Sequence, residues 1–195
     1  RTAGAIGKVR RNGPDSKSGR YYLTGHHAGG FSKMAIIPKR WRPLLEAPFK
    51  VSDRCCDVLK KQPLNGYARR SGRVPITGEM VTDGGVRAVK WVQHGCNAWD
   101  LRKPKSSPLA FWTEADIWAY IRSRDLAYCS VYDEGYDRTG CVWCCFGVHH
   151  EKGENRFQMM HRTHPKLWDY CINKMGLDEV LDFIEVPYLP DGADE

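Results

Sequence analysis

Apolar residues recur at helical spacing most clearly near the C-terminus. Pro165 suits the first turn of a helix, and Gly176 suits its end. The residues between them that fall on one apolar face are Leu167, Trp168, Cys171, Ile172 and Met175. The pattern therefore predicts an amphipathic helix over 165–175, preceded by a polar helix over 155–162 and followed by a short helix over 177–184.

Another helix is predicted from a strong start signal in the middle of the chain. Thr113 is a good N-cap, and Asp116 three residues later approximates a capping box. Apolar residues then recur on one helix face. The helix should end near Arg124, and the polar stretch beyond it is predicted to be a loop that leads to Cys141.

The stretch around the first pair of cysteines also carries a helix signal. Ser52 is a credible N-cap for a helix predicted over 53–61, and Cys55 and Cys56 lie in its first turn. The partial positive charge at a helix N-terminus lowers thiol pKa values there and so favours thiolates. Pro63 is expected to stop this helix.

A short polar helix over 65–71 is predicted next, followed by a buried strand over 73–81 that ends in the turn Asp83-Gly84-Gly85. Small residues at a strand end, with Arg87 just beyond, are typical of phosphate sites in α/β sheets. An ordinary turn explains two glycines equally well. The aromatic stretch over 91–99 is predicted to be irregular.

The N-terminal residues 1–40 show little periodicity, and we expect a short helix followed by an irregular basic loop. His26 and His27 lie in a glycine-rich stretch and are expected to face solvent rather than bind metal. Four residues are expected to form an apolar cluster after this segment: Trp41, Leu44, Leu45 and Phe49.

Composition places the chain among globular proteins, because 42% of its 195 residues are hydrophobic and 27% are charged. The net charge of +7 fits an anionic partner such as a nucleotide, a sulfonucleotide or nucleic acid, and it equally fits a basic solvated surface. No apolar run is long enough to cross a membrane, and the first residues lack the apolar core of a signal peptide. A cytoplasmic protein without a membrane partner is therefore expected.

Eight cysteines in such a chain favour metal binding, since reducing compartments keep thiols free. Cys55 and Cys56 are adjacent, and Cys141 and Cys144 form a Cys-x-x-Cys pair. Four thiolates bind either zinc or an iron-sulfur cluster. Adjacent cysteines on a helix diverge by about 100°, which suits the separate corners of a cluster better than one zinc ion. Cys55 and Cys56 as small core residues remain a third interpretation.

The motifs around these cysteines resemble a known family. The adjacent cysteines, Lys60 and the later Cys-x-x-Cys are similar to the cluster motif of adenylylsulfate reductases. A wider pattern resembles phage and bacterial phosphoadenosine phosphosulfate (PAPS) reductase-like proteins. It covers most of Trp41 to Tyr188, in the stretches 47–56, 108–114, 138–141 and 155–170.

This resemblance implies an α/β fold of the adenine-nucleotide-hydrolase (Rossmann-like) type, helix-rich in this C-terminal portion. It implies a 4Fe-4S cluster on the four paired cysteines, with Lys60 beside it. Arg54 and Arg87 are further cations expected to offset the cluster's negative charge and to attract ATP, PAPS or adenosine phosphosulfate (APS). Asp83 and Arg87 are expected to form one wall of the nucleotide pocket.

Two departures from the family pattern change the expectation. The phosphate-binding loop of the family, Ser-Gly-Gly-x-Asp-Ser, has no counterpart before Trp41. The chain therefore resembles the C-terminal part of a longer or split enzyme, and an upstream polypeptide carrying that loop is an expected partner. The family's C-terminal catalytic cysteine is also missing, because the last cysteine, Cys171, falls on an apolar helix face where we expect it in the core.

Without that nucleophile, the sulfur-transfer relatives that modify DNA or tRNA become an attractive comparison. Cys145 is then a candidate sulfur carrier, and Cys144 and Cys145 are able to exchange the ligand role. The leading interpretation is an iron-sulfur, PAPS reductase-like protein acting on an adenylated or sulfonucleotide species. The alternative is a non-catalytic nucleic-acid-binding module braced by a cluster or zinc. The expected division is a basic segment over 1–40, a cluster-binding domain over 41–190 and a frayed acidic tail over 191–195.

Overall fold

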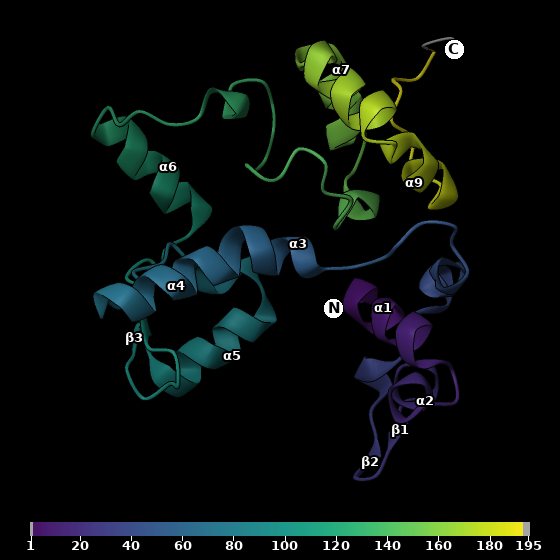
Figure 1. Cartoon of the computed structure of the whole chain (residues 1–195). Helices are drawn as coiled ribbons and strands as arrows, with labels where there is room; N and C mark the ends of the chain where they lie inside the picture. Colours follow the sequence, from purple (N-terminus) through teal and green to yellow (C-terminus); the bar gives the residue numbers. More distant parts are fainter. Residues whose placement is uncertain (1, 193–195) are drawn as a thin grey trace. The chain divides into compact units, whose positions relative to one another are not determined.

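A computed structural model of the chain describes residues 2–192 and contains mainly helices (Figure 1). The described residues divide into two compact units. The first comprises the described residues up to Leu45 together with Val51–Tyr128, and the second comprises Glu46–Lys50 together with the described residues from Cys129 onward. The predicted fraying of the acidic tail concerns 193–195 in part, and those residues lie outside the described chain. None of the described helices has the length and apolar character that a membrane span requires.

The first unit begins with a small helical assembly that the sequence only partly predicted. Its elements are α1 (Thr2–Asn12), α2 (Lys17–Thr24), the hairpin of β1 (His26–His27) and β2 (Gly30–Phe31), and two 3₁₀ helices, η1 (Lys33–Ala35) and η2 (Lys39–Leu45). The expected irregular loop is therefore wrong over α2. The helix forms there because the Ser16 hydroxyl accepts a hydrogen bond from the Gly19 N–H at 2.9 Å and so caps it.

This assembly has its own hydrophobic core. Its buried members are Ala5, Ile6, Val9 and Ile37, and Tyr22, Leu23, Trp41, Leu44, Leu45 and Val51 pack around them. The apolar cluster predicted after residue 40 is thus divided. Phe49 instead belongs to the second unit, where its ring lies 5.4 Å from that of Phe183. His26 and His27 are exposed, as predicted.

The cysteine-bearing helix is longer than predicted. It runs through α3 (Arg54–Cys56), a π-helical segment η3 (Asp57–Lys61) and α4 (Gln62–Ser71) without a break, and Figure 1 shows α3 and α4 in line. The prediction that Pro63 ends the helix is wrong. The Gln62 N–H bonds the carbonyl of Asp57 five residues back, and this wider turn moves aside the carbonyl that the proline ring would otherwise meet.

The predicted buried strand over 73–81 does not form. Only Ile76 makes a parallel bridge, to Ser106, and its side chain is 76% exposed. The chain continues through η4 (Val81–Asp83) into α5 (Gly85–His94), whose last residues, 91–94, lie in the stretch over 91–99 that was predicted to be irregular. The strands near Ile76 that the described chain offers, β3 (Asn97–Ala98) and β4 (Lys105–Ser106), pair with each other over two residues each and provide too short an edge to order a longer strand.

Helix α6 (Glu114–Ser123) confirms the predicted start signal. The Asp116 N–H donates to the Thr113 hydroxyl at 3.3 Å, and the Thr113 N–H donates to the Asp116 carboxylate at 2.8 Å, which completes the capping box. A short 3₁₀ helix, η5 (Ser130–Tyr132), interrupts the loop that was predicted to follow.

The second unit follows the sequence pattern closely. Besides η5, its helices are η6 (Val148–His150), α7 (Arg156–Thr163), α8 (Pro165–Asp169), the π-helical η7 (Tyr170–Lys174) and α9 (Leu177–Phe183). Pro165 starts a helix, and Gly176 ends it with a φ of 69°. The core residues are Val148, Phe157, Met160, Cys171, Ile172, Leu181 and Val186. Cys171 is fully buried, as predicted.

Candidate functional site

The first pair of candidate metal ligands lies at the start of the long helix. Cys55 and Cys56 are both free and exposed in α3, so the interpretation of these residues as core hydrophobes is wrong. The Ser52 hydroxyl accepts a hydrogen bond from the Arg54 N–H at 3.2 Å and fixes the first turn. Arg54 and Lys60 flank the two thiols on the same helix, and both are exposed. The expected cations therefore accompany this pair.

The second pair of candidate ligands lies in a turn of the second unit. The Cys144 N–H donates to the carbonyl of Cys141 at 3.0 Å, which closes the Cys-x-x-Cys turn. Both cysteines are free and partly exposed. A closed turn of this kind directs two sulfurs to one side of the loop, as thiolate metal sites require.

Arg156 fixes this turn through hydrogen bonds to its backbone. Its guanidinium donates to the carbonyl of Cys144 at 3.0 Å and to the carbonyl of Phe146 at 3.3 Å. It also pairs with the carboxylate of Glu151, to which its Nε donates at 2.8 Å. The two side chains are only 18% and 26% exposed, so this pair is a well-fixed link between α7 and the cysteine turn. Arg138 approaches the same carboxylate at 3.6 Å.

Cys145 lacks the features of a reactive thiol, which is exposed and has a lowered pKa. Its side chain packs against the core of the second unit. Burial, followed by the neighbouring Cys144, raises the pKa of the Cys145 thiol to about 11 even though Arg156 opposes the shift. In this conformation Cys145 is a protonated, partly buried thiol.

The chemistry of the donor set fits a thiolate-bound metal group. All four candidate ligands are free thiols at accessible or partly accessible positions, and cations accompany the exposed pair. Cys55 and Cys56 belong to the first unit, and Cys141 and Cys144 belong to the second. Over the described residues 2–192, no three His, Cys, Asp or Glu side chains are grouped closely enough to hold a metal ion.

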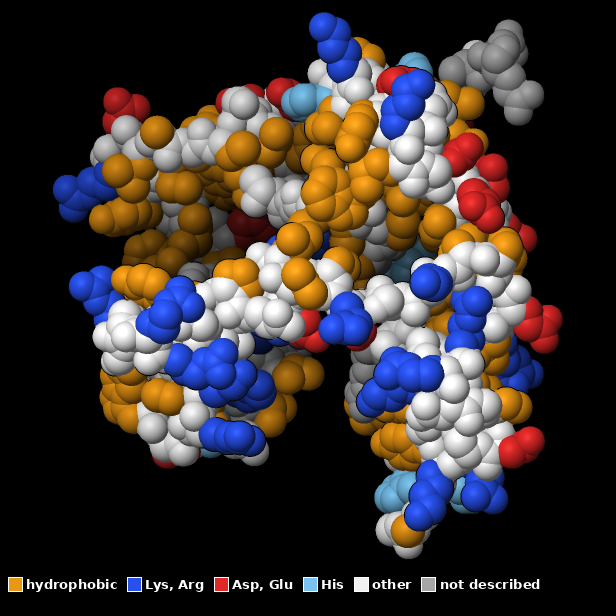
Figure 2. Space-filling model, viewed as in Figure 1, with side chains coloured by type: hydrophobic (Ala, Val, Ile, Leu, Met, Phe, Trp, Pro, Cys, Tyr) orange, Lys and Arg blue, Asp and Glu red, His pale blue; other side chains and the backbone are white. Residues whose placement is uncertain are grey.

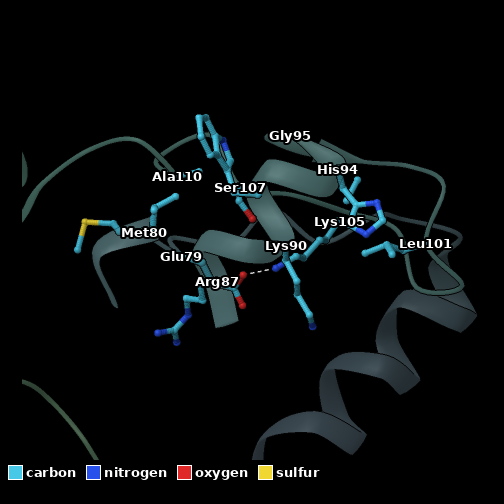
Figure 3. Close-up of a pocket in the computed structure, with 13 residues that line it drawn as sticks. Glu79, Met80, Arg87, Lys90, His94, Gly95, Leu101, Lys105, Ser107 and Ala110 are labelled. Atoms are coloured by element: carbon cyan, nitrogen blue, oxygen red, sulfur yellow. Dashed lines mark hydrogen bonds and ion pairs between the residues drawn. The ribbon is translucent and has the colours of Figure 1, made fainter. Parts of the chain in front are cut away.

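A small basic pocket lies beside α5 in the first unit (Figure 3). Arg87, Lys90, Trp91 and His94 line it from α5, since residues three and four apart share a helix face. The remaining lining residues come from the segments on either side of that helix: Glu79, Met80, Val81, Gly95, Ala98, Leu101, Lys105, Ser107 and Ala110. The pocket thus offers cations and one indole ring on a single wall.

The charges in this pocket are partly paired. Lys105 pairs with Glu79, as the dashed line in Figure 3 marks, and the ring of His94 lies 2.7 Å from the carboxylate of Asp100. Among the lining residues, Arg87, Lys90 and Lys105 are positively charged and Glu79 is negatively charged. The pocket therefore has an excess of positive charge.

The predicted pair of Asp83 and Arg87 is brought together at the rim of the pocket. The Arg87 guanidinium donates to the Asp83 carbonyl at 3.1 Å and lies 3.5 Å from its carboxylate. That carboxylate in turn accepts a hydrogen bond from the Met80 N–H at 3.1 Å. Sequence reasoning missed Lys90, His94 and Lys105, although the helical spacing of the α5 residues was available as a signal.

Glu151 should make the second unit sensitive to acid. Burial works to raise the pKa of Glu151, but the hydrogen bonds and charge of Arg156 outweigh it, and the pKa lies below its usual value. A carboxylate whose pKa is lowered by folding stabilises the folded state at pH values above its unfolded-state pKa. That contribution is lost as pH falls through the folded-state pKa. We expect Glu151→Gln to cost about 1–2 kcal/mol of unfolding free energy at neutral pH, and the difference from wild type to narrow as pH falls below the usual pKa of a glutamate. Urea unfolding at several pH values measures this, and a gap that stays constant with pH would contradict it.

Comparison with known proteins identifies related sequences. A family model described as the phosphoadenosine phosphosulfate reductase domain matches residues 27–146. The phosphoadenosine 5'-phosphosulfate reductase of Gloeobacter violaceus is 38% identical over 91 residues, which cover 46% of this chain and 36% of the relative. The adenosine 5'-phosphosulfate reductase of Staphylococcus epidermidis is 45% identical over 94 residues, covering 47% of this chain and 37% of the relative.

The adenosine 5'-phosphosulfate reductase of Salinibacter ruber is 33% identical over 109 residues, which cover 53% of this chain and 40% of the relative. Aligned regions thus span well under half the length of these curated relatives. No solved structure matches the chain.

Proposed function

Because the chain belongs to the phosphoadenosine phosphosulfate reductase domain family, we propose that it binds and acts on a sulfonucleotide or another adenylated species. The family resemblance inferred from the cysteine motifs is confirmed, and membership implies an α/β fold of the adenine-nucleotide-hydrolase type. The observation that carries the proposal is the basic pocket beside α5, because its excess of cations suits the phosphate and sulfate groups of APS or PAPS.

Three side chains that line the pocket, and one beside it, have distinct parts in the proposed binding. Arg87 presents a planar guanidinium, which matches two oxygens of a phosphate or sulfate at once. Lys90 adds a second positive charge one turn along α5. Trp91 is 37% exposed and offers a ring face for stacking on adenine. Asp83 holds Arg87 in place through the rim contacts.

We propose in addition that Cys55, Cys56, Cys141 and Cys144 hold a 4Fe-4S cluster, with Arg54 and Lys60 offsetting its negative charge. The proposal is supported by the free thiols, the adjacent cysteines on one helix and the closed Cys-x-x-Cys turn. When bound, such a cluster supplies fixed negative charge and a covalent link between the segments that carry its ligands. Zinc on the same thiolates is the alternative, which metal analysis distinguishes.

For the reaction, sulfonucleotide reduction requires a thiolate that attacks the sulfur of the substrate. The new S–S bond forms as the S–O bond to the nucleotide breaks, and the nucleotide phosphate leaves with the electron pair.

In the sulfur-transfer variant we propose Cys145 as the carrier, which requires the turn to uncover its buried thiol. Cys145→Ala should then keep the metal and lose transfer, whereas loss of metal would assign Cys145 as a ligand in place of Cys144.

A partner polypeptide that carries a glycine-rich phosphate-binding loop completes this proposal. The proposed partner is supported by large apolar side chains that are exposed to solvent in the described part of the first unit. Ile76 is 76% exposed, and Val86 and Val92 on α5 are 73% and 77% exposed. An exposed apolar helix face of this kind suits packing against a sheet.

Arg87→Gln tests the nucleotide site. We expect this variant to bind APS and PAPS at least about tenfold more weakly than wild type, because glutamine cannot offer the charged bidentate hydrogen bonds of a guanidinium. Titration calorimetry of the full chain, with and without the proposed partner polypeptide, measures the affinity. Arg102→Gln is the control, since this exposed arginine lies next to the pocket without lining it. Equal affinities for wild type and Arg87→Gln, or equal losses of affinity in both variants, would overturn the proposed site.

A further inference from the structure

Positive charge is concentrated in the small helical assembly over residues 2–45. This segment contains one carboxylate, Asp15, and nine basic side chains: Lys8, Arg10, Arg11, Lys17, Arg20, Lys33, Lys39, Arg40 and Arg42. Residues 46–195 contain 20 basic and 22 acidic side chains. The basic character of the whole chain therefore originates in this segment and is not a general property of its surface.

All nine basic side chains are exposed. Figure 2 displays Lys and Arg side chains over the part of the first unit that Figure 1 labels α1, α2, β1 and β2. The charges therefore face solvent on α2, the two 3₁₀ helices and α1, and they do not converge on a single pocket. A dispersed array of cations suits an extended polyanion better than a small anion.

The elements that carry these cations are fixed to one another by the core around Ile6, which is fully buried. The Arg42 guanidinium donates to the carbonyl of Leu23 at 3.2 Å and so links η2 to α2. The Lys8 ammonium donates to the Tyr22 hydroxyl at 3.2 Å and links α1 to α2. Preformed positions reduce the entropy cost of binding a polyanion.

Membrane lipid is a poorer fit than nucleic acid. An interfacial helix binds a bilayer by inserting a free apolar face into the lipid. The apolar residues of α1, including Ile6 and Val9, are buried in the core of the assembly instead. Helices α1 and α2 also lie before residue 27, where the family match begins.

We propose that residues 2–45 form a nucleic-acid-binding surface that contacts the phosphate backbone. Phosphate contacts position a protein on nucleic acid without reading its bases, so binding should be independent of sequence and strongly weakened by salt. This function is separate from nucleotide binding in the pocket beside α5, and each stands if the other fails.

The test compares two variants that each replace three exposed lysines. One carries Lys17→Gln, Lys33→Gln and Lys39→Gln within the basic segment. The control carries Lys152→Gln, Lys166→Gln and Lys174→Gln in the second unit and changes the net charge by the same amount. Fluorescence anisotropy of the full chain with a labelled mixed-sequence DNA duplex, and separately with single-stranded RNA, gives the affinity at a series of salt concentrations.

We expect the first variant to bind at least about tenfold more weakly than wild type at low salt, and its log affinity to fall less steeply with log salt. On duplex DNA, the slope should decrease by about 0.9 for each phosphate that the variant no longer neutralises. The control variant should stay within about twofold of wild type and keep its slope. Replacing the same three lysines by arginine should preserve binding, which separates charge from folding.

Equal weakening in both glutamine variants would overturn the proposal, because it would assign binding to net charge alone. Binding of wild type to phosphatidylserine vesicles but not to either nucleic acid would overturn it in favour of a membrane surface. Failure of wild type to bind DNA and RNA at low salt would also overturn it.

Discussion

Cys141→Ser should deprive the chain of its metal. We expect anaerobically purified wild-type protein to be brown, to absorb broadly near about 400 nm, and to contain about four irons per chain if all four thiols hold a cluster. Serine is a much poorer ligand than a thiolate for iron in such clusters, so the variant should lose most of both signals. Iron and sulfide analysis with the visible spectrum measures this, and Cys55→Ser should behave in the same way.

Cys129→Ser is the matched control, because Cys129 is another exposed free cysteine outside both paired motifs. It should keep the iron content and the spectrum of wild type. A colourless wild-type protein with one zinc ion per four thiolates would replace the cluster proposal with the zinc alternative. Equal loss of iron in Cys129→Ser and Cys141→Ser would show that the ligands are misassigned.

Arg156→Gln should destabilise the second unit strongly. The substitution removes the donors to the carbonyls of Cys144 and Phe146 and leaves the carboxylate of Glu151, which is only 26% exposed, without its nearest cation. Breaking a partly buried pair in this way costs about 2–4 kcal/mol of unfolding free energy. Urea unfolding followed by tryptophan fluorescence measures the loss, since Trp143 and Trp168 both lie in this unit.

The same substitution should weaken metal binding, because Arg156 fixes the turn that carries two proposed ligands. Loss of a residue that orients metal ligands lowers affinity by about 10- to 100-fold. Titration of the apo chain with cobalt, followed by the thiolate absorption bands, measures this separately from stability. Arg156→Lys should recover part of the stability but little of the turn geometry, since an ammonium cannot reproduce the planar fork.

Arg162→Gln provides the control on the same helix. Arg162 pairs with Glu154 at 3.1 Å, but its side chain is 59% exposed, and exposed pairs contribute about 0–1 kcal/mol. This variant should therefore change neither unfolding nor cobalt binding appreciably. If Arg156→Gln were as mild as Arg162→Gln, the bracing role of Arg156 would be refuted.

The sequence by itself determined those features that depend on neighbours along the chain. Helix α6 was predictable because its capping box uses Thr113 and Asp116, three residues apart, and the boundaries at Pro165 and Gly176 follow from the backbone preferences of proline and glycine. The paired cysteines and their flanking motifs were likewise sufficient to predict the family. The helix signals act within a turn or two of helix, and the family motifs are read from residue identity and order, so neither needs tertiary context.

Only the tertiary structure decided the features that depend on distant partners. Pro63 continues a helix because a π-helical turn accommodates it, and the residues over 73–81 form no strand because the described chain offers Ile76 a single bridging partner. The contacts of Lys105 with Glu79 and of Arg156 with the cysteine turn join residues far apart along the chain or on different elements. Such contacts leave no periodic pattern, since their free energy arises from packing and charge pairing that exist only after the chain has folded.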